Sequence, residues 1–307
     1  MKVLNCCQSD WANFSHDNAN ALRSVGVHCI DVKIYRHSFG YPDQSRIMTL
    51  HEIRHQMLHA DVVQIMHSDL KMLSLAKDMD KKRIIVYHTG TAYRQGSKMM
   101  NQIFNPHVEK SVLALGEFAG LGAKNEVYMV GAIDTRQIAH TENADKVYAV
   151  AHYPSNKWKG SDTIERAIRD LHGQRHDFNF KMSKKTVDYD QQLKRMNGCD
   201  IYVELLSTHQ MDKQYGSWGI SALEAAAMGK IVITCHTTEG IYEEAYGVKT
   251  PFIVCHSEQE LKDKLNHLLN QPLEEIRRLQ GLSREWVVKY HSYKASGERI
   301  KWIINKN

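Results

Sequence analysis

The stretch that most constrains how this chain can fold is Tyr215–Thr234, where a glycine-rich loop, an alanine-rich run and an apolar run follow one another. Gly216 and Gly219 allow the backbone of the loop to come close to a ligand. The alanine-rich run predicts a helix, Gly229 predicts its end, and Ile231–Thr234 predicts a buried strand. A glycine loop that opens onto a helix favours anion binding, because the free N–H groups and the helix dipole both point at the ligand.

Glu224 is the one acid on this otherwise apolar helix, and the residues alone leave two interpretations of it. In the first, Ser221 and Glu224 form a capping box, in which the glutamate only accepts a backbone N–H. In the second, Glu224 faces a ligand bound near the start of the helix. The stretch favours neither, so the choice depends on the rest of the chain.

The sequence from Gly216 to Ile233 resembles the donor-site signature of glycosyltransferase family 4, the large retaining group with the GT-B fold, in which a glycine-rich loop leads into LEAMA-x-GKPVI. The resemblance implies that Glu224 holds the ribose hydroxyls of a nucleotide sugar. A second glutamate, eight positions earlier, contacts the sugar in that family, and here that position is Gly216. The donor-binding residues implied around this loop are Gly216, Ser217, Trp218, Gly219, Ile220 and Glu224.

The order of the predicted elements indicates two α/β halves. Val3–Cys6 predicts a strand, Phe14–Val25 a helix and His28–Lys33 a second strand, which together make a βαβ unit. A strand pattern restarts at Val147–Ala151, after a polar and unpatterned segment. The resemblance implies a GT-B fold, with two Rossmann-like domains facing across a cleft and a C-terminal helix that crosses back to the first. We expect an acceptor domain at 1–140, a nucleotide-sugar donor domain at 141–290 and the terminal helix at 291–307.

Two histidines follow buried strands in the first half. His67 comes after Asp61–Met66 and His88 after the next strand, so both lie at the edge where open parallel sheets bind ligands. The segment from His88 to Arg94 resembles the family's HGSD-x-R segment, which implies that His88 lines the acceptor side and contacts the donor sugar. A structural role is the alternative for each single histidine. The further acceptor-side residues that we expect are Asp10, His67 and Arg94.

A lysine stands before a helix in the second half as well. Lys159 and Gly160 precede a predicted helix from Thr163 to His172, an arrangement that places a point charge beside free N–H groups. The segment resembles the family's P-S-…-K-G-x-D, whose lysine neutralises the donor diphosphate. The resemblance therefore assigns Lys159, with His88, to catalysis. It assigns Ser155 and Lys157 to donor binding, with Lys157 in place of the family's companion arginine. A solvated loop charge is the alternative for Lys159.

The composition agrees with a globular protein that handles anions. The 307 residues are 42% hydrophobic and 24% charged, with a formal charge of +5 and 18 histidines in addition. This mildly basic balance suits an anionic donor, acceptor or surface, and it does not by itself indicate nucleic-acid binding. Six cysteines lie without a framework spacing, and we find neither a secretory leader nor an apolar run long enough to span a bilayer. We therefore expect a cytoplasmic protein with reduced thiols.

These features predict a retaining glycosyltransferase, hexosyltransferase-like, that uses a UDP- or GDP-sugar as co-substrate and no further cofactor. A D-x-D motif is missing from the sequence, which agrees with the metal-independent habit of GT-B enzymes. The acceptor hydroxyl could belong to a saccharide, a lipid or a hydroxymethylated base of modified DNA, an anionic polymer. Two alternatives from other classes stay open: a non-catalytic nucleotide-sugar binding module, suggested by Gly216, and a GT-B sugar-nucleotide epimerase.

Overall fold

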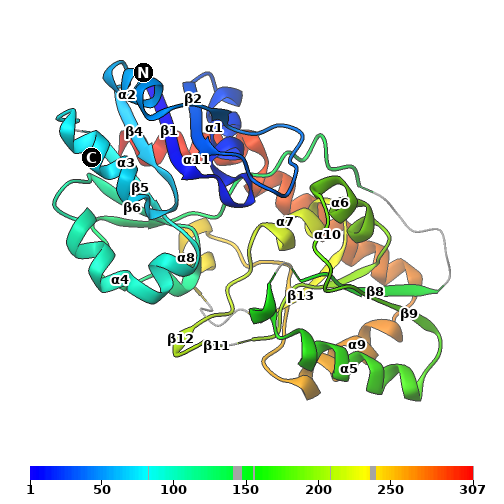
Figure 1. Cartoon of the computed structure of the whole chain (residues 1–307). Helices are drawn as coiled ribbons and strands as arrows, with labels where there is room; N and C mark the ends of the chain where they lie inside the picture. Colours follow the sequence, from blue (N-terminus) through cyan, green and yellow to red (C-terminus); the bar gives the residue numbers. More distant parts are fainter. Residues whose placement is uncertain (82, 141–146, 155, 208, 236–239, 307) are drawn as a thin grey trace. The chain divides into compact units, whose positions relative to one another are not determined.

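The computed structural model describes residues 1–81, 83–140, 147–154, 156–207, 209–235 and 240–306, and it divides into two compact units. The first unit joins Met1–Asp134 to Tyr290–Asn307, and the second unit is Thr135–Lys289. Each unit contains its own parallel sheet, as Figure 1 shows. Among the described residues, no helix combines the length and the apolar character that crossing a membrane requires.

The sheet of the first unit has seven parallel strands in the order β3-β2-β1-β4-β5-β6-β7. Its central strands β4 and β5 are buried along their whole length, as expected for a parallel sheet with helices on both faces. The strands are β1 (Lys2–Ser9), β2 (His28–Tyr35), β3 (Arg46–Ile47), β4 (Val62–Ile65), β5 (Ile84–His88), β6 (Lys110–Leu113) and β7 (Glu126–Tyr128). The helices are α1 (Phe14–Ser24), α2 (Leu50–Leu58), α3 (Leu70–Asp78), α4 (Gly90–Phe104) and α11 (Tyr293–Asn305), with single turns at Trp11–Asn13, Met66–Ser68 and Gly116–Phe118.

The second unit contains a five-stranded parallel sheet in the order β14-β13-β10-β8-β9 and an antiparallel hairpin, β11–β12. Apolar side chains of α5 and α9 pack with those of the sheet into one core. The strands are β8 (Tyr148–His152), β9 (Phe178–Met182), β10 (Ile201–Val203), β11 (His209–Gln210), β12 (Lys213–Gln214), β13 (Ile231–Thr234) and β14 (Ile253–Val254). The helices are α5 (Ser161–Gln174), α6 (Tyr189–Asn197), α7 (Ile220–Ala227), α8 (Ile241–Tyr246), α9 (Glu258–Leu269) and α10 (Leu273–His291), with one turn at Lys157–Lys159.

Each sheet has one point at which the strand order reverses. In the first unit the chain leaves β1 for β2 on one side and later places β4 on the other. In the second unit it leaves β8 for β9 and then places β10 on the opposite side of β8. Loops that follow the two strands at such a switch point diverge and leave a crevice, which is where open α/β sheets bind ligands. The loops after β1 and β4, and those after β8 and β10, are therefore where a site is expected.

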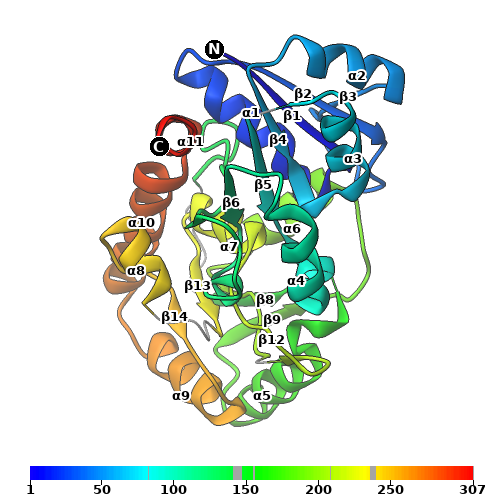
Figure 2. The ribbon, with the colours of Figure 1, turned by 90° about the vertical axis from the view of Figure 1, so that its left-hand side faces the viewer.

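The terminal helix α11 belongs to the first unit and lies beside α1, as Figures 1 and 2 both show. The two helices approach closely at Gly297, where an added Cβ would lie 2.1 Å from the carbonyl oxygen of Ala21. The end of α11 is also held by cations of the sheet region: Arg83 donates to the carbonyl of Ile304 at 2.7 Å, and Lys110 to that of Ile303 at 2.8 Å. These contacts satisfy carbonyls that the end of a helix leaves free.

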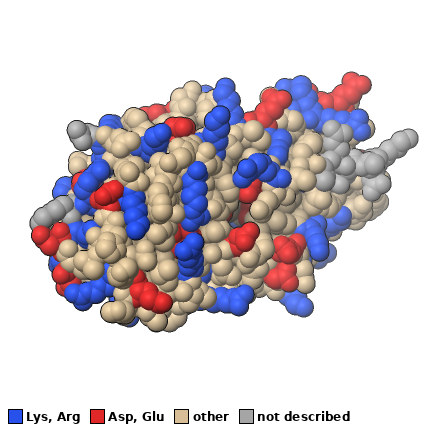
Figure 3. All heavy atoms as spheres, turned by 90° about the horizontal axis from the view of Figure 1, so that it is seen from above, with Lys and Arg blue, Asp and Glu red and all other residues tan. Residues whose placement is uncertain are grey.

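The charged surface is mixed in sign. On the face drawn in Figure 3, Lys and Arg side chains are widespread and Asp and Glu side chains lie among them. Among its described residues, this face therefore carries no patch of a single sign that would account for the formal charge of +5.

Candidate functional site

The switch point of the second unit gathers charged side chains from three segments. Lys159 follows β8, Glu204 directly follows β10, and Ser221 lies in the first turn of α7. The Lys159 ammonium donates to Glu204 Oε1 at 2.5 Å and to Ser221 Oγ at 2.9 Å. The Ser221 hydroxyl donates to the same Glu204 oxygen at 3.0 Å. All three contacts are local to this edge of the sheet, so they form one cluster, which we call the Lys159 cluster (Lys159, Glu204 and Ser221).

The Lys159 cluster is buried, with 5% of Lys159 and 1% of Glu204 exposed. Burial by itself lowers the pKa of Lys159, but the adjacent Glu204 carboxylate outweighs burial and raises it. Lys159 is therefore a fixed positive charge. Glu204 Oε2 is buried and has no hydrogen-bond partner among the described residues. Such a carboxylate is stable only because its other oxygen is paired with the lysine.

Gly160 fixes the turn that follows Lys159. Its φ is +73°, and an added Cβ would lie 1.9 Å from the carbonyl oxygen of Leu206, so only glycine fits. The next residue, Ser161, begins α5, whose start has no side-chain cap. His152 at the end of β8 joins these parts, since its ring nitrogens contact Val203 O at 2.7 Å and Ser161 Oγ at 2.9 Å. Burial lowers the pKa of His152 to about 4, so the ring is neutral at pH 7.

Helix α7 begins at the same edge, and its start has no side-chain cap either. The capping box that the sequence offered for Ser221 and Glu224 is not formed, because the N-cap residue is Gly219 and Ser221 is bonded to Lys159 and Glu204. Glu224 lies one turn farther along, and burial raises its pKa to about 7, against the hydrogen bond with Tyr189 and the charge of Lys159. The edge thus combines a fixed cation, two uncapped helix starts and a titratable acid, which are the elements of an anion site.

The glycine loop before α7 is anchored by an aromatic cluster. Trp218 is buried, and its ring centroid lies 5.6 Å from Tyr242, 5.1 Å from Phe252 and 5.8 Å from Trp286. Gly216 has φ +136°, which a residue with a Cβ rarely adopts. The buried indole therefore holds the loop in place. Because the Trp218 ring is packed inside, a ligand at this loop would contact backbone groups.

Four further residues were predicted to bind the donor: Ser155, Lys157, Ser217 and Ile220. Ser155 lies outside the described residues, and Lys157 opens the turn that ends at Lys159. Ile220 is the first residue of α7, and Ser217 is buried beside the loop glycines. All of these positions stay predictions.

The switch point of the first unit holds a second polar network. His67, after β4, contacts Asp10, after β1, with Nε2 3.2 Å from Oδ1, and its Nδ1 lies 2.7 Å from the Thr89 hydroxyl. The Asp10 carboxylate is fully buried and also accepts the backbone N–H groups of Ser15 and His16. This geometry fixes the imidazole between a carboxylate and a hydroxyl, so the ring is held in one orientation.

The loops that carry this network have left-handed backbone at non-glycine residues. Ala12 and Asn13 have φ of 56° and 55°, and His67 and Ser68 have φ of 61° and 54°. Such conformations cost about 1 kcal/mol or more each and cluster at ligand sites. Their occurrence in pairs, on the two loops of one switch point, marks this edge as a candidate site.

His88 and Arg94 are placed inside the first unit. His88 is fully buried, stacks on Tyr93 at a centroid distance of 4.0 Å, and its Nδ1 lies 2.8 Å from the Ser68 hydroxyl. Burial lowers its pKa to about 3, so it is neutral at pH 7. Arg94 is buried too and pairs with Glu117 at 2.5 Å. Both side chains are therefore packed inside the first unit, where His88 contacts Ser68 of the loop after β4. A direct contact of either residue with substrate stays a prediction.

Solved structures resemble the whole chain. HepE (Alr3699) of Anabaena, in complex with UDP and glucose, matches at a TM-score of 0.70 with 12% sequence identity over 100% of both chains. The alpha-glucosyltransferase AGT, in complex with UDP, matches at a TM-score of 0.68 with 10% identity over 99% of both chains. A glycosyltransferase of Rickettsia africae matches at 0.65 with 12% identity, over 100% of this chain and 99% of that one. The chain has the GT-B fold.

The sequence comparisons cover less of the chain. Residues 161–301 match the family model described as glycosyl transferase-like. No curated protein sequence matches. The family match and the GT-B fold together support a glycosyltransferase, and the fold class expected from the sequence is confirmed.

Among the described residues, one group of side chains has metal-ligand chemistry. Ligand atoms of Cys7, Asp10 and His67 lie within 4.8 Å of one another. Burial raises the pKa of the Cys7 thiol well above its usual range, and Lys33, fully buried, is close enough to act on that pKa. A neutral thiol, a nearby ammonium and a carboxylate already occupied by N–H donors disfavour a bound cation. The group is better explained as part of the polar network around Asp10.

Sequence reasoning missed Glu204 and Thr89. Glu204 could have been found, because it is an acid placed directly after an apolar strand in an α/β chain. Thr89 carries no comparable signal, since a threonine after a strand is common.

Proposed function

We propose that the protein is a retaining glycosyltransferase that moves a sugar from a nucleotide-diphosphate sugar to an acceptor hydroxyl. The observation that carries the proposal is the Lys159 cluster, placed at the switch point of the second unit beside the uncapped starts of α5 and α7. A fixed cation and free N–H groups at one edge suit a diphosphate better than a neutral ligand.

UDP-sugars are the donors that we favour. HepE has been crystallised with UDP-glucose and AGT with UDP, and both share the GT-B fold with this chain. In our proposal the diphosphate contacts Lys159 and the backbone between Gly216 and Ile220, and Glu224 accepts a ribose hydroxyl. The buried position of Glu224 near Lys159 supports this assignment.

In the proposed reaction the acceptor oxygen bonds to the anomeric carbon while the bond from that carbon to the diphosphate oxygen breaks. The leaving phosphate oxygen takes the acceptor proton, so no carboxylate nucleophile or metal is needed. Lys159 and the helix N–H groups stabilise the charge that develops on the diphosphate, which is usually the largest catalytic contribution. His67, held by Asp10 and Thr89, orients the acceptor hydroxyl on the first unit.

The test begins with thermal unfolding in the presence of UDP, GDP, UDP-glucose and GDP-mannose. We expect a UDP-sugar to raise the melting temperature of the wild type. Lys159→Ala would leave Glu204 buried without its partner and would itself destabilise the fold by about 3–5 kcal/mol. The informative variant is therefore Lys159→Met/Glu204→Gln, which removes both charges and should fold but show no donor-induced shift.

Lys264→Ala is the matched control, because Lys264 is exposed on α9 and pairs with no acid among the described residues. It should respond to donor like the wild type. Mass spectrometry with saccharide, lipid and hydroxymethylated DNA acceptors, followed by NMR of the product's anomeric proton, tests transfer and retention. An unchanged shift in the double variant contradicts the diphosphate assignment. Donor binding without any product would favour a binding module, and isomerised donor would favour an epimerase.

A further inference from the structure

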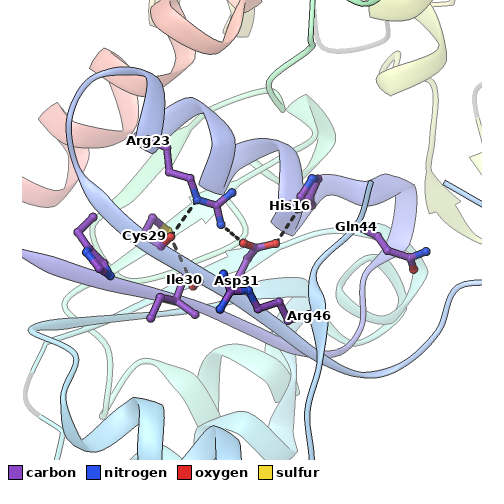
Figure 4. Close-up of a pocket in the computed structure, with 8 residues that line it drawn as sticks. His16, Arg23, Cys29, Ile30, Asp31, Gln44 and Arg46 are labelled. Atoms are coloured by element: carbon purple, nitrogen blue, oxygen red, sulfur yellow. Dashed lines mark hydrogen bonds and ion pairs between the residues drawn. The ribbon is translucent and has the colours of Figure 1, made fainter. Parts of the chain in front are cut away.

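The first unit has a concave feature at the edge of its sheet, beside β2 and β3. Strand β3 pairs only with Val32 and Lys33, so residues 28–31 of β2 have no strand beside them on that side in the described part of the chain. A cavity of about 540 Å³ opens there, as Figure 4 shows. Its polar lining consists of His16, Arg23, His28, Asp31, Gln44 and Arg46.

Arg23 is held rigidly in this cavity. Its guanidinium donates to the Cys29 carbonyl at 3.0 Å, to Asn20 Oδ1 at 2.5 Å and to the Asp31 carboxylate. These bonds use three of its five N–H groups, and the side chain is 36% exposed. The remaining N–H groups are therefore oriented before any ligand binds.

Asp31 is the one acid of the lining, and its charge is already neutralised. Its carboxylate is 3% exposed and is bonded to Arg23 and, at 2.8 Å, to His16 Nδ1. Burial acts to raise the pKa of Asp31, but the hydrogen bonds and charges of His16 and Arg23 outweigh burial and lower it. Asp31 thus stays ionised, and its charge is balanced by Arg23 and His16. Its repulsion of an anion bound in the cavity is therefore weak.

The open part of the cavity is basic. Arg46 and His28 are exposed, and neither side chain has a hydrogen bond or ion pair with any residue that the structure describes. In the view of Figure 4, Arg23 comes from α1 and Arg46 from β3, with Asp31 between them. One restrained guanidinium and one unpaired guanidinium at the same hollow are the groups that bind phosphate and carboxylate in the forked, two-bond geometry.

We propose that this cavity binds a small molecule through a phosphate or carboxylate group. Its volume lies in the range of small-ligand pockets and is too large for a lone ion. The cavity borders the network of the first unit, because the backbone N–H of His16 donates to Asp10 at 3.1 Å. The proposal nevertheless uses none of the side chains of Lys159, Asp10, His67 and Thr89.

The test is hydrogen-exchange mass spectrometry with two probes, inorganic phosphate and succinate, each titrated at constant ionic strength. The background is Lys159→Met/Glu204→Gln, which removes phosphate binding at the second unit. At least one probe should protect the segment 23–46, and the arm that protects more strongly identifies the group as phosphate or carboxylate. Arg46→Ala should weaken the binding about tenfold, because a charge-assisted bond is lost.

Arg54→Ala is the control, since Arg54 is an exposed arginine of α2 in the same unit and does not line the cavity. It should leave the affinity unchanged. Arg23 is not varied, because its loss would leave Asp31 partly unpaired. Failure of both probes to protect the segment 23–46, or an equal loss of affinity in Arg46→Ala and Arg54→Ala, overturns the proposal.

Discussion

At the scale of single residues, the second unit depends on a charge pair that is expensive to break. Lys159 and Glu204 are both buried, and their pairing offsets the cost of placing two charged side chains away from water. A diphosphate bound at this edge would share Lys159 with Glu204 rather than receive a free cation. The uncapped starts of α5 and α7 would then supply a large part of the attraction.

We predict that replacing Glu224 increases the stability of the protein while it weakens donor binding. Its pKa of about 7 lies above the ordinary value of 4.5, so the folded state binds its proton more tightly than the unfolded state does. The corresponding stability is fully present below pH 4.5 and is lost as the pH rises to about 7, a loss of about 3 kcal/mol. Glu224→Gln should therefore raise the free energy of unfolding at pH 8 and leave it nearly unchanged at pH 4.5.

Urea unfolding at the two pH values measures the effect, and Glu244→Gln, an exposed acid of α8, serves as the comparison. The same Glu224 variant should lose donor-induced stabilisation if the glutamate holds the ribose. Equal stability of wild type and Glu224→Gln at pH 8 would contradict the burial argument.

At the scale of elements, we expect the turn between β8 and α5 to tolerate substitution poorly. Gly160→Ala should destabilise the protein by on the order of 3 kcal/mol, because the methyl group meets the Leu206 carbonyl and the backbone is left-handed. Gly173→Ala, in the same helix α5 with no atom within 4 Å of the added Cβ, should be neutral or stabilising by up to about 1 kcal/mol. Chemical denaturation of the two variants checks the pair, and similar losses in both would show that the close approach is unimportant.

The elements around the sites differ in how well the sequence predicted them. Helix α7 and strand β13 were predicted, because alanines dominate the helix and β-branched residues dominate the strand. Gly229 separates the two elements. Helix α4 was missed, since it contains Gly90 and Gly96, and Gly96 departs from helical geometry at φ −131°. The two-residue strand β3 and the hairpin β11–β12 were also missed, because such short pairings depend on neighbours rather than on local pattern.

At the scale of the whole molecule, the strand order could be expected only in outline. The alternation of strands and helices predicted parallel sheets, and the resemblance predicted the GT-B fold. The positions of the two switch points were not readable, because the side on which β4 or β10 joins its sheet is set by contacts far apart in sequence. For the same reason Glu204 could not be paired with Lys159 from the sequence, although each follows a strand.

Buried histidines predict how the molecule responds to acid. Burial lowers the pKa of His88 and His291 to about 3 and that of His152 to about 4, from an ordinary value of 6.5. Their contribution to stability is complete above pH 6.5 and is lost as the pH falls below it, because only the unfolded chain takes up the protons. Each histidine adds a slope that approaches about 1.4 kcal/mol per pH unit near pH 5.

Unfolding in urea at pH 7.5, 6 and 5 measures this slope. His88→Phe keeps the stacking on Tyr93 and should lower the slope of unfolding free energy against pH by the contribution of one histidine. His51→Phe, at an exposed position of α2, should leave that slope unchanged. Identical slopes in His88→Phe and the wild type would show that His88 is protonated in the folded state.

The position of α11 in the chain has a consequence for biosynthesis. The helix packs against α1, yet a ribosome makes it only after the entire second unit has been synthesised. Until then the nascent first unit lacks the contact of Gly297 with Ala21 of α1, and the ammonium of Lys110 lacks its carbonyl partner, Ile303. The first unit, although most of it is made earlier, can therefore complete its packing only after the whole second unit has been synthesised.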